Sequence, residues 1–180
     1  MRALVVYESM YGNTHVIASS IADGLCADFE VTLVPVAEAS RDLVSDADLL
    51  VAGAPTHMHG LSTRSTRRMA AQAAAKDGSG LRMDPGSGGP GMQDWLRDLG
   101  HRSGLAVAFD TRLNGVPAFT GRASRRIARM LRQHGRRVIG APESFLIGSQ
   151  NTLLDGEAER ARRWGMTLGA ASKTYLPTPA

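Results

Sequence analysis

The sequence has little cysteine, few aromatic residues and no long hydrophobic run, and each shortage excludes a class of protein. Cys26 is the single cysteine among 180 residues, so no disulfide forms within the chain and no CxxC pair exists for zinc or thiol chemistry. Any redox chemistry therefore requires a bound cofactor. The apolar run in the N-terminal segment MRALVVYES is too short for a signal peptide or a membrane span. We therefore expect a cytoplasmic protein with no membrane partner.

Basic residues outnumber acidic ones and give a formal net charge of +4. Much of the excess is arginine within residues 122–137. A basic protein favours acidic partners or ligands, although net charge alone names no partner. The length suits one well-buried domain over residues 1–180, because neither an internal repeat nor a linker divides the chain.

Apolar runs alternate with segments of helical periodicity along the whole chain. Buried strands are predicted at 4–7, 31–36, 49–53, 105–109 and 138–147, the last with a bend at Pro142. Helices are predicted between them, and a final helix over 157–171 has Asp155 as its expected N-cap. This alternation indicates an α/β fold, a three-layer open doubly wound sandwich with a five-stranded parallel sheet. The order expected for the strands is 2-1-3-4-5, one of the common orders of such sheets.

Three loops are expected at the ligand-binding edge of such a sheet. Ligands bind beyond the carboxyl ends of the strands, where the strand order reverses, and here that point lies between strands one and three. The loops that reach it are 9–14, 55–62 and 110–121.

The first of these loops, SMYGNT at residues 9–14, joins a strand directly to a helix. Unpaired backbone N–H groups and the helix dipole favour an anion there. Gly12 lets the backbone approach the anion, Ser9 and Thr14 add hydroxyl groups, and no lysine or arginine is present. These neutral donors predict a permanently held phosphate monoester, since the patterns GxxxxGKS/T and GxGxxG are absent. The alternative is a loop without ligand in which Ser9 or Asn13 caps the helix.

SMYGNT resembles the phosphate loop of the flavodoxin family, S/T-x-T-G-x-T, which cradles the phosphate of FMN. It is closer still to the S-x-Y-G loop of the flavodoxin-like NAD(P)H:quinone oxidoreductases. The second loop, GAPTHMHGLS, is similar to their G-x-P-T-x-x-G segment, which passes the isoalloxazine ring. The resemblance implies FMN as cofactor, and electron transfer or NAD(P)H-dependent reduction of a small acceptor such as a quinone. A flavin reacts by its own chemistry, so no catalytic acid, base or nucleophile is required.

The resemblance and the three expected loops together define a set of candidate FMN-binding residues. They are Ser9, Met10, Tyr11, Gly12, Asn13, Thr14, Pro55, Thr56, His57, Met58, His59, Gly60, Thr111, Arg112 and Phe119.

The sequence also departs from the electron-transfer flavodoxins. Tyr11 replaces a threonine of the phosphate loop, and His57 stands where those proteins often have a tryptophan. The candidates beside the ring are Phe119, Met58, His57 and His59, which stack less closely than a Trp/Tyr pair. A histidine there would stabilise an anionic reduced flavin, whereas the alternative is a pair of ordinary loop histidines. A metal site is not expected, because these histidines have no third ligand nearby in sequence.

The arginines of 122–137 and the segment 77–91 allow more than one interpretation. Arg122, Arg125, Arg126, Arg129, Arg132 and Arg136 are expected on one helix face, opposite Ala123, Ile127, Met130 and Leu131. They form either a solvated face or a module without flavin that binds anions or acidic partners; nucleic acid is not favoured, because aromatic residues are not interleaved.

The segment 77–91 is rich in glycine and proline, and this composition predicts that it is mobile. We expect it close to the carboxyl edge of the sheet. Its expected role is that of a lid or of an oligomer contact, and a homo-oligomer is left open. Cys26 is expected as a small buried residue of the first helix.

Overall fold

The computed structural model describes residues 1–57, 59–116 and 120–176. The strands are β1 (Arg2–Tyr7), β2 (Glu30–Pro35), β3 (Leu49–Pro55), β4 (Leu105–Leu113), β5 (Arg137–Val138) and β6 (Glu143–Ile147). They pair in parallel in the order β2-β1-β3-β4-β5. β5 pairs with the first residues of β4, and β6 pairs in parallel with the later residues of β4. The predicted fold and strand order are confirmed; the predicted fifth strand is divided into β5 and β6 at residues 139–142, which include Pro142.

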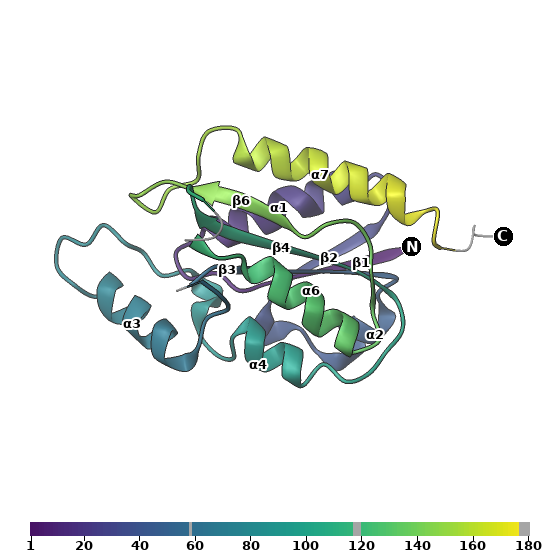
Figure 1. The fold of residues 1–180 in the computed structure, drawn as a ribbon, viewed down its shortest axis with the longest axis horizontal. Helices are drawn as coiled ribbons and strands as arrows, with labels where there is room; N and C mark the ends of the chain where they lie inside the picture. Colours follow the sequence, from purple (N-terminus) through teal and green to yellow (C-terminus); the bar gives the residue numbers. More distant parts are fainter. Residues whose placement is uncertain (58, 117–119, 177–180) are drawn as a thin grey trace.

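Helices cover both faces of the sheet, which gives the predicted three layers (Figure 1). The helices are α1 (Asn13–Leu25), α2 (Arg41–Asp46), α3 (Arg64–Ala74), α4 (Met92–Arg97), α6 (Ala123–Gln133) and α7 (Glu157–Ser172), with short 3-10 turns η1 (Val36–Glu38) and η2 (Pro85–Ser87). In Figure 1, α1 and α7 lie on one side of the sheet and α2, α4 and α6 on the other, while α3 lies beyond the carboxyl ends of the strands. None of the helices described is long and apolar enough to cross a membrane.

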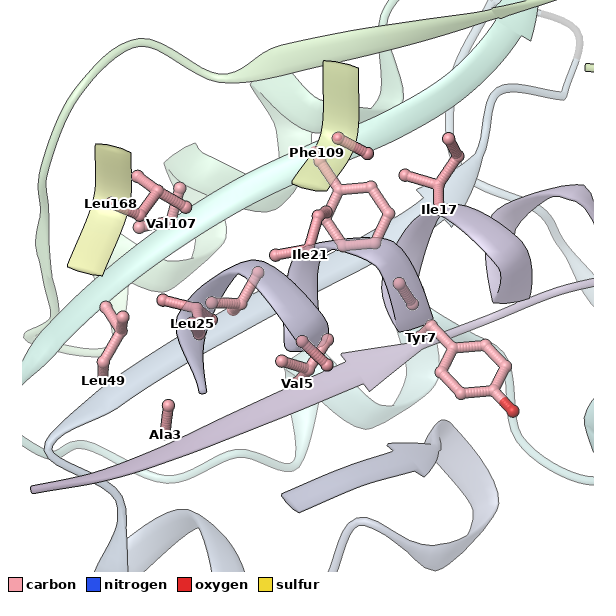
Figure 2. Close-up of a cluster of buried hydrophobic side chains, with 14 of the residues drawn as sticks. Ala3, Val5, Tyr7, Ile17, Ile21, Leu25, Leu49, Val107, Phe109 and Leu168 are labelled. Carbon is pink, nitrogen blue, oxygen red and sulfur yellow. The ribbon is translucent and has the colours of Figure 1, made fainter. Parts of the chain in front are cut away.

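Alternate residues of each strand enter one of two hydrophobic cores. Val5 and Phe109 pack with Ile21 of α1 on one face, whereas Leu4 packs with Ile127 of α6 on the other. Figure 2 shows the first cluster, with Val5, Ile21 and Phe109 between the sheet and α1. Because every central strand is buried on both faces, its sequence is a continuous apolar run rather than an alternating one.

The α1–α7 pair approaches closely at two glycines. A Cβ on Gly24 would overlap the carbonyl oxygen of Arg162, and one on Gly165 would overlap that of Ile21. Overpacking of this kind typically costs about 1 to 3 kcal/mol. The close contact fixes α1, and with it the loop that precedes α1, against the rest of the fold.

Local details of four elements differ from the sequence-based expectations. Cys26 is exposed and lies after the end of α1 at Leu25, rather than being a buried residue of that helix. Gly156, with φ 79°, occupies the N-cap position of α7 in place of Asp155. Strand β4 continues to Leu113, so Thr111 belongs to the strand rather than to the following loop. Arg136 lies after the end of α6 and is buried, so it does not belong to the exposed arginine face.

Candidate functional site

A cavity of about 70 Å³ lies at the carboxyl ends of β1, β3 and β4, where the strand order reverses. Its lining comes from the first two expected loops, from β4 and from the segment after β6. The lining residues are Ser9, Met10, Tyr11, Asn13, Thr14, Pro55, Thr56, His57, Thr111, Ile147 and Asn151. The site therefore brings together most of the sequence-predicted residues and adds two that were not predicted.

The loop before α1 leaves backbone donors free for an anion. Gly12 is the N-cap, with φ 91°, and no side chain caps the helix. The Ser9 hydroxyl instead accepts from the backbone N–H of Gly12 over 3.1 Å. The first intrahelical bond is donated by Val16 N to Gly12 O, so the N–H groups of residues 13–15 have no helical acceptor. This arrangement contradicts the alternative of a side-chain cap by Ser9 or Asn13.

Thr14 is oriented by a partner on β4. Its side chain is buried, and its Oγ1 lies 2.7 Å from Oγ1 of Thr111. Only one of the two hydroxyl hydrogens is used in that contact, so the pair keeps one O–H for another acceptor. Two residues far apart in the sequence, one in α1 and one in β4, thus present one hydroxyl donor at the cavity.

A buried carboxylate supports the phosphate loop from behind. Glu8, directly after β1, is 5% exposed and accepts from the backbone N–H of Met92 over 2.7 Å and from the hydroxyl of Ser62. Its own N–H donates to Gly53 O. Glu8 therefore joins the end of β1 to β3 through its backbone and to Ser62 and the start of α4 through its side chain.

The segment 77–91 contacts the phosphate loop through Asp84. The backbone N–H of Asp84 donates to Met10 O over 2.8 Å, and its buried carboxylate lies 3.1 Å from Nδ1 of His15 and accepts from Gly86 N. The ring of Tyr7 stacks on His15, with 4.5 Å between centroids, and burial together with the Asp84 charge raises the pKa of Tyr7 to about 12. The predicted position at the carboxyl edge is confirmed, and the segment is anchored there at its C-terminal half.

The second and third loops hold each other through backbone contacts. His57 and Gly60 exchange N–H···O bonds of 2.8 and 2.9 Å, and the backbone of His59, at φ 75°, bridges to Gly121. The Thr56 hydroxyl accepts from the first N–H of α6, at Ala123, over 2.9 Å. A Cβ on Gly121 would overlap the backbone of His59, so only glycine permits this approach.

The two histidines of the second loop differ in environment. His57 lines the cavity, and burial lowers its pKa below the ordinary value, with Glu8 acting weakly in the opposite direction. Its imidazole is therefore neutral near pH 7. His59 is exposed and lies outside the cavity lining. Met58 and Phe119, predicted beside the ring, lie outside the described residues.

Arg112 does not face the cavity, in contrast to the expectation. It is 7% exposed, and its Nη1 donates to the carbonyls of Leu113 and Gly115 and to the hydroxyl of Thr120. The reason is that β4 extends to Leu113, so Thr111 and Arg112 are neighbours within one strand. Neighbouring side chains of a strand point to opposite faces, and the Thr111 side chain is the one that points to the cavity.

Ile147 and Asn151 were missed by the sequence analysis. The side-chain amide of Asn13 donates to the backbone oxygen of Asn151 over 2.8 Å, and this contact closes one side of the phosphate loop. Asn151 has φ 57°, a conformation that asparagine tolerates better than most residues. The turn sequence GSQN after the last strand was the available signal.

Within the described part of the chain, no group of three histidine, cysteine or acidic residues is placed to hold a metal ion. The site thus consists of neutral hydroxyl and N–H donors at a helix N-terminus, beside a loop with a neutral imidazole. That donor set fits a phosphate ester whose remaining part extends toward the second and third loops.

Comparisons with known proteins agree with this geometry. The flavodoxin family model matches residues 5–164, so the chain belongs to the flavodoxin family. Members of this family bind FMN, and FMN is accordingly the cofactor of the chain. No curated protein sequence matches the chain.

Several solved structures share the fold at low sequence identity. A flavodoxin from the domain Archaea has a TM-score of 0.66 and 18% identity, with 96% of this chain and 99% of that chain covered. A WrbA-like flavodoxin from Agrobacterium tumefaciens has a TM-score of 0.54 and 19% identity, with 97% and 99% covered. The flavodiiron protein from Giardia intestinalis has a TM-score of 0.63 and 21% identity, and the match covers 97% of this chain but 36% of that longer one.

Proposed function

We propose that this flavodoxin-family protein binds FMN with its phosphate in the loop 9–14 and its ring beside the loops 55–60 and 111–121. The observation that carries this assignment is the uncapped N-terminus of α1, where three backbone N–H groups precede the first helical bond. The Ser9 side chain and the Thr14–Thr111 pair lie in the same cavity. A phosphate dianion in that position would meet only neutral donors and the positive end of the helix dipole.

Bound FMN supplies one- and two-electron transfer, and the protein contributes position and electrostatics. We infer that the protein exchanges electrons with a small molecule or with an acidic redox partner, and that NAD(P)H-dependent reduction of an acceptor such as a quinone is the favoured reaction. The net charge of +4 and the histidine at the second loop support this preference. In a low-potential carrier, an acidic surface destabilises the anionic reduced flavin and so lowers its potential, whereas this chain is basic.

Electron transfer to an acidic protein is the second candidate, and α6 supports it. The exposed residues Arg125, Arg129 and Arg132 line a shallow groove with Pro142, and the ion pairs of the described residues include none of these arginines. Because α6 begins at the Thr56 hydroxyl, an acidic protein in this groove would lie next to the second loop. Electrostatic complementarity of this kind chiefly raises the association rate and makes it dependent on salt.

Spectroscopy of the purified protein tests the assignment. Yellow protein with one FMN per chain, bleached by anaerobic addition of NADH or NADPH and reoxidised by a quinone, is expected for the favoured reaction. Bleaching by dithionite but by neither nicotinamide would support the electron-carrier candidate. Protein that takes up no FMN would refute both.

A double substitution on α6 tests electron transfer to an acidic protein. Arg125→Gln/Arg129→Gln should slow reduction of an acidic acceptor protein at low salt and leave reduction of a neutral quinone unchanged.

A further inference from the structure

A groove with arginine residues lies at the end of the sheet opposite the proposed FMN site. A groove of about 710 Å³ is lined by Ser45, Ala47, Asp48, His101, Arg102, Ser103, Gly104 and Leu176. Asp48 and Gly104 directly precede β3 and β4, so the groove is at the amino ends of the strands. A ligand there cannot touch the cofactor cavity, which is at the carboxyl ends.

Beneath one wall of this groove is Arg136, a buried cation with unused donors. Its side chain is 3% exposed, and its Nη2 donates to Val44 O over 3.1 Å, whereas Nε and Nη1 have no partner among the described residues. Gly104 makes room for the guanidinium, because a Cβ at this position would come 2.7 Å from Nη1. Buried donors without acceptors are rare and costly, and an unpaired buried charge is more so.

Arg102 adds a second guanidinium to the same segment. Its Nη2 donates to the backbone oxygen of Ser45 and its Nη1 to the Ser45 hydroxyl, so the head group is held at the groove. Burial lowers the pKa of Arg136, and the positive charge of Arg102 lowers it further. Two like charges in one region favour an anion there.

Two carboxylates are the other charges near the groove. Asp46 pairs with the Arg2 side chain at 3.1 Å. Asp48 lines the groove, accepts from the backbone N–H of Arg2 and keeps its single negative charge, against the two positive charges of Arg102 and Arg136. His101 lies on the same side as Arg102, and its ring borders Gly135. Within the described ranges, the ion pairs contain neither Arg102 nor Arg136.

We propose that this groove is a second anion site, which takes the phosphate group of a small molecule against Arg102, His101 and Ser103, with the buried charge of Arg136 behind them. The exposed residues would make the contacts, and Arg136 would act by raising the positive potential at the Gly104 wall. Such a site would serve an effector or an anchoring group rather than an electron donor, because the FMN cavity lies at the other end of the strands.

The test uses FMN-saturated protein, so that the loop 9–14 is already occupied. Inorganic phosphate is titrated against sodium chloride of equal ionic strength, by calorimetry and by NMR of the arginine Nε–H signals. One phosphate per chain should bind with FMN retained, and the Arg136 Nε–H signal should shift. Arg102→Gln should weaken phosphate binding by roughly tenfold or more, the scale of a hydrogen bond to a charged group, while the control Arg97→Gln, with the same change in net charge, should bind as wild type does.

Three outcomes would overturn the proposal. Phosphate could bind only after FMN is removed, Arg102→Gln could bind phosphate as tightly as Arg97→Gln, or succinate at equal ionic strength could bind more tightly than phosphate. Arg136→Met adds a second variant, and its absorbance spectrum and melting temperature show whether it folds. Because Arg102 is exposed and remote from the cofactor cavity, Arg102→Gln decides the matter even if Arg136→Met does not fold.

Discussion

The phosphate loop and the loops beside it are built in different ways at the same edge of the sheet. Residues 9–14 present neutral donors at the start of a long, tightly packed helix, and buried side chains such as Glu8 and Asp84 hold the loop from behind. The loops at 55–60 and around Gly121 are instead joined by the backbone bridge between His59 and Gly121 and by the Thr56 hydroxyl, which accepts from Ala123 N. On the proposed assignment, the first region would determine how strongly the phosphate of FMN binds, and the second would determine the environment of the ring.

Because of this difference, we expect the first region to control the affinity for FMN and the second region to control its redox potential. A change in the phosphate loop alters donors that bind oxidised and reduced cofactor alike, since the phosphate charge does not change on reduction. A change at His57 alters a titratable group whose interaction depends on the charge of the ring. Mutations in the two regions should therefore have separable readouts, and the predictions below run from the largest expected effect to the smallest.

Removing the carboxylate behind the phosphate loop should have the largest effect. Glu8→Ala leaves the Met92 N–H and the Ser62 hydroxyl without their acceptor in a buried position. The expected loss in the free energy of unfolding is about 2 to 4 kcal/mol, by analogy with other unsatisfied buried donors. Chemical denaturation measures it, with the exposed Glu38→Ala as control; equal stability of the two variants would contradict the role of Glu8.

Removing a phosphate-loop hydroxyl should weaken FMN binding without changing the potential. Thr14→Ala should cost about 1 to 2 kcal/mol of FMN binding, the scale of a hydrogen bond to a charged group. Thr14→Ser keeps the hydroxyl that faces Thr111 and is the matched control. Fluorescence titration of apoprotein with FMN measures the change, and equal affinity of wild type and Thr14→Ala would refute the assignment of the loop.

The imidazole of His57 should affect the potential rather than the affinity. Burial lowers the pKa of His57 in the protein without flavin, and a negative charge on the reduced ring nearby would raise it. Reduction would then be accompanied by proton uptake at His57, so the stabilisation of the reduced state is present at low pH and is lost as the pH rises past the raised pKa.

Redox titrations from roughly pH 5 to 9, which bracket the usual histidine pKa, test this dependence. His57→Gln should have a lower potential than wild type at acid pH and an unchanged one at alkaline pH. His59→Gln is the control, because its side chain is exposed and outside the cavity lining. Three superimposable curves would show that neither imidazole senses the ring.

The smallest effect is expected around Gly78 and Gly80, where Ser79 bonds to Ala74 at the end of α3 and to the neighbouring residues Lys76 and Leu81. A Cβ on Gly78 or Gly80 would meet no other atom within 4 Å, so deleting both should leave the melting temperature nearly unchanged. Asp84→Asn tests the anchored part, because it removes the charge that faces His15 and should lower the melting temperature by more than the deletion does. A larger loss in the deletion than in Asp84→Asn would reverse this division of the segment.

Much of the fold could be predicted from local patterns. The apolar runs of β1 and β3 carry the signature of strands buried on both faces, and the strand-loop-helix sequence around Gly12 indicates an anion site because backbone geometry alone creates it. The expected loops 9–14 and 55–62 do supply most of the cavity lining.

The remaining errors came from contacts between distant segments. The length of β4 depends on its pairing with β6, which turned Arg112 away from the cavity and Thr111 toward it. Asn151 lies in the turn after β6, and the pairing of β6 with β4 brings that turn to the same edge of the sheet as Asn13.

By itself, the sequence determined the α/β class and the neutral loop 9–14, because these follow from hydrophobic periodicity and from the backbone at a helix N-terminus. The expected strand order came from the known order of such folds. Only the tertiary structure decided which side chains are neutral, buried or paired. The lowered pKa of His57, the burial of Arg136 beneath Gly104 and the position of Asp84 against Met10 each depend on residues far apart in the chain. Burial and electrostatic interaction are properties of such neighbours, and residue type alone does not contain them.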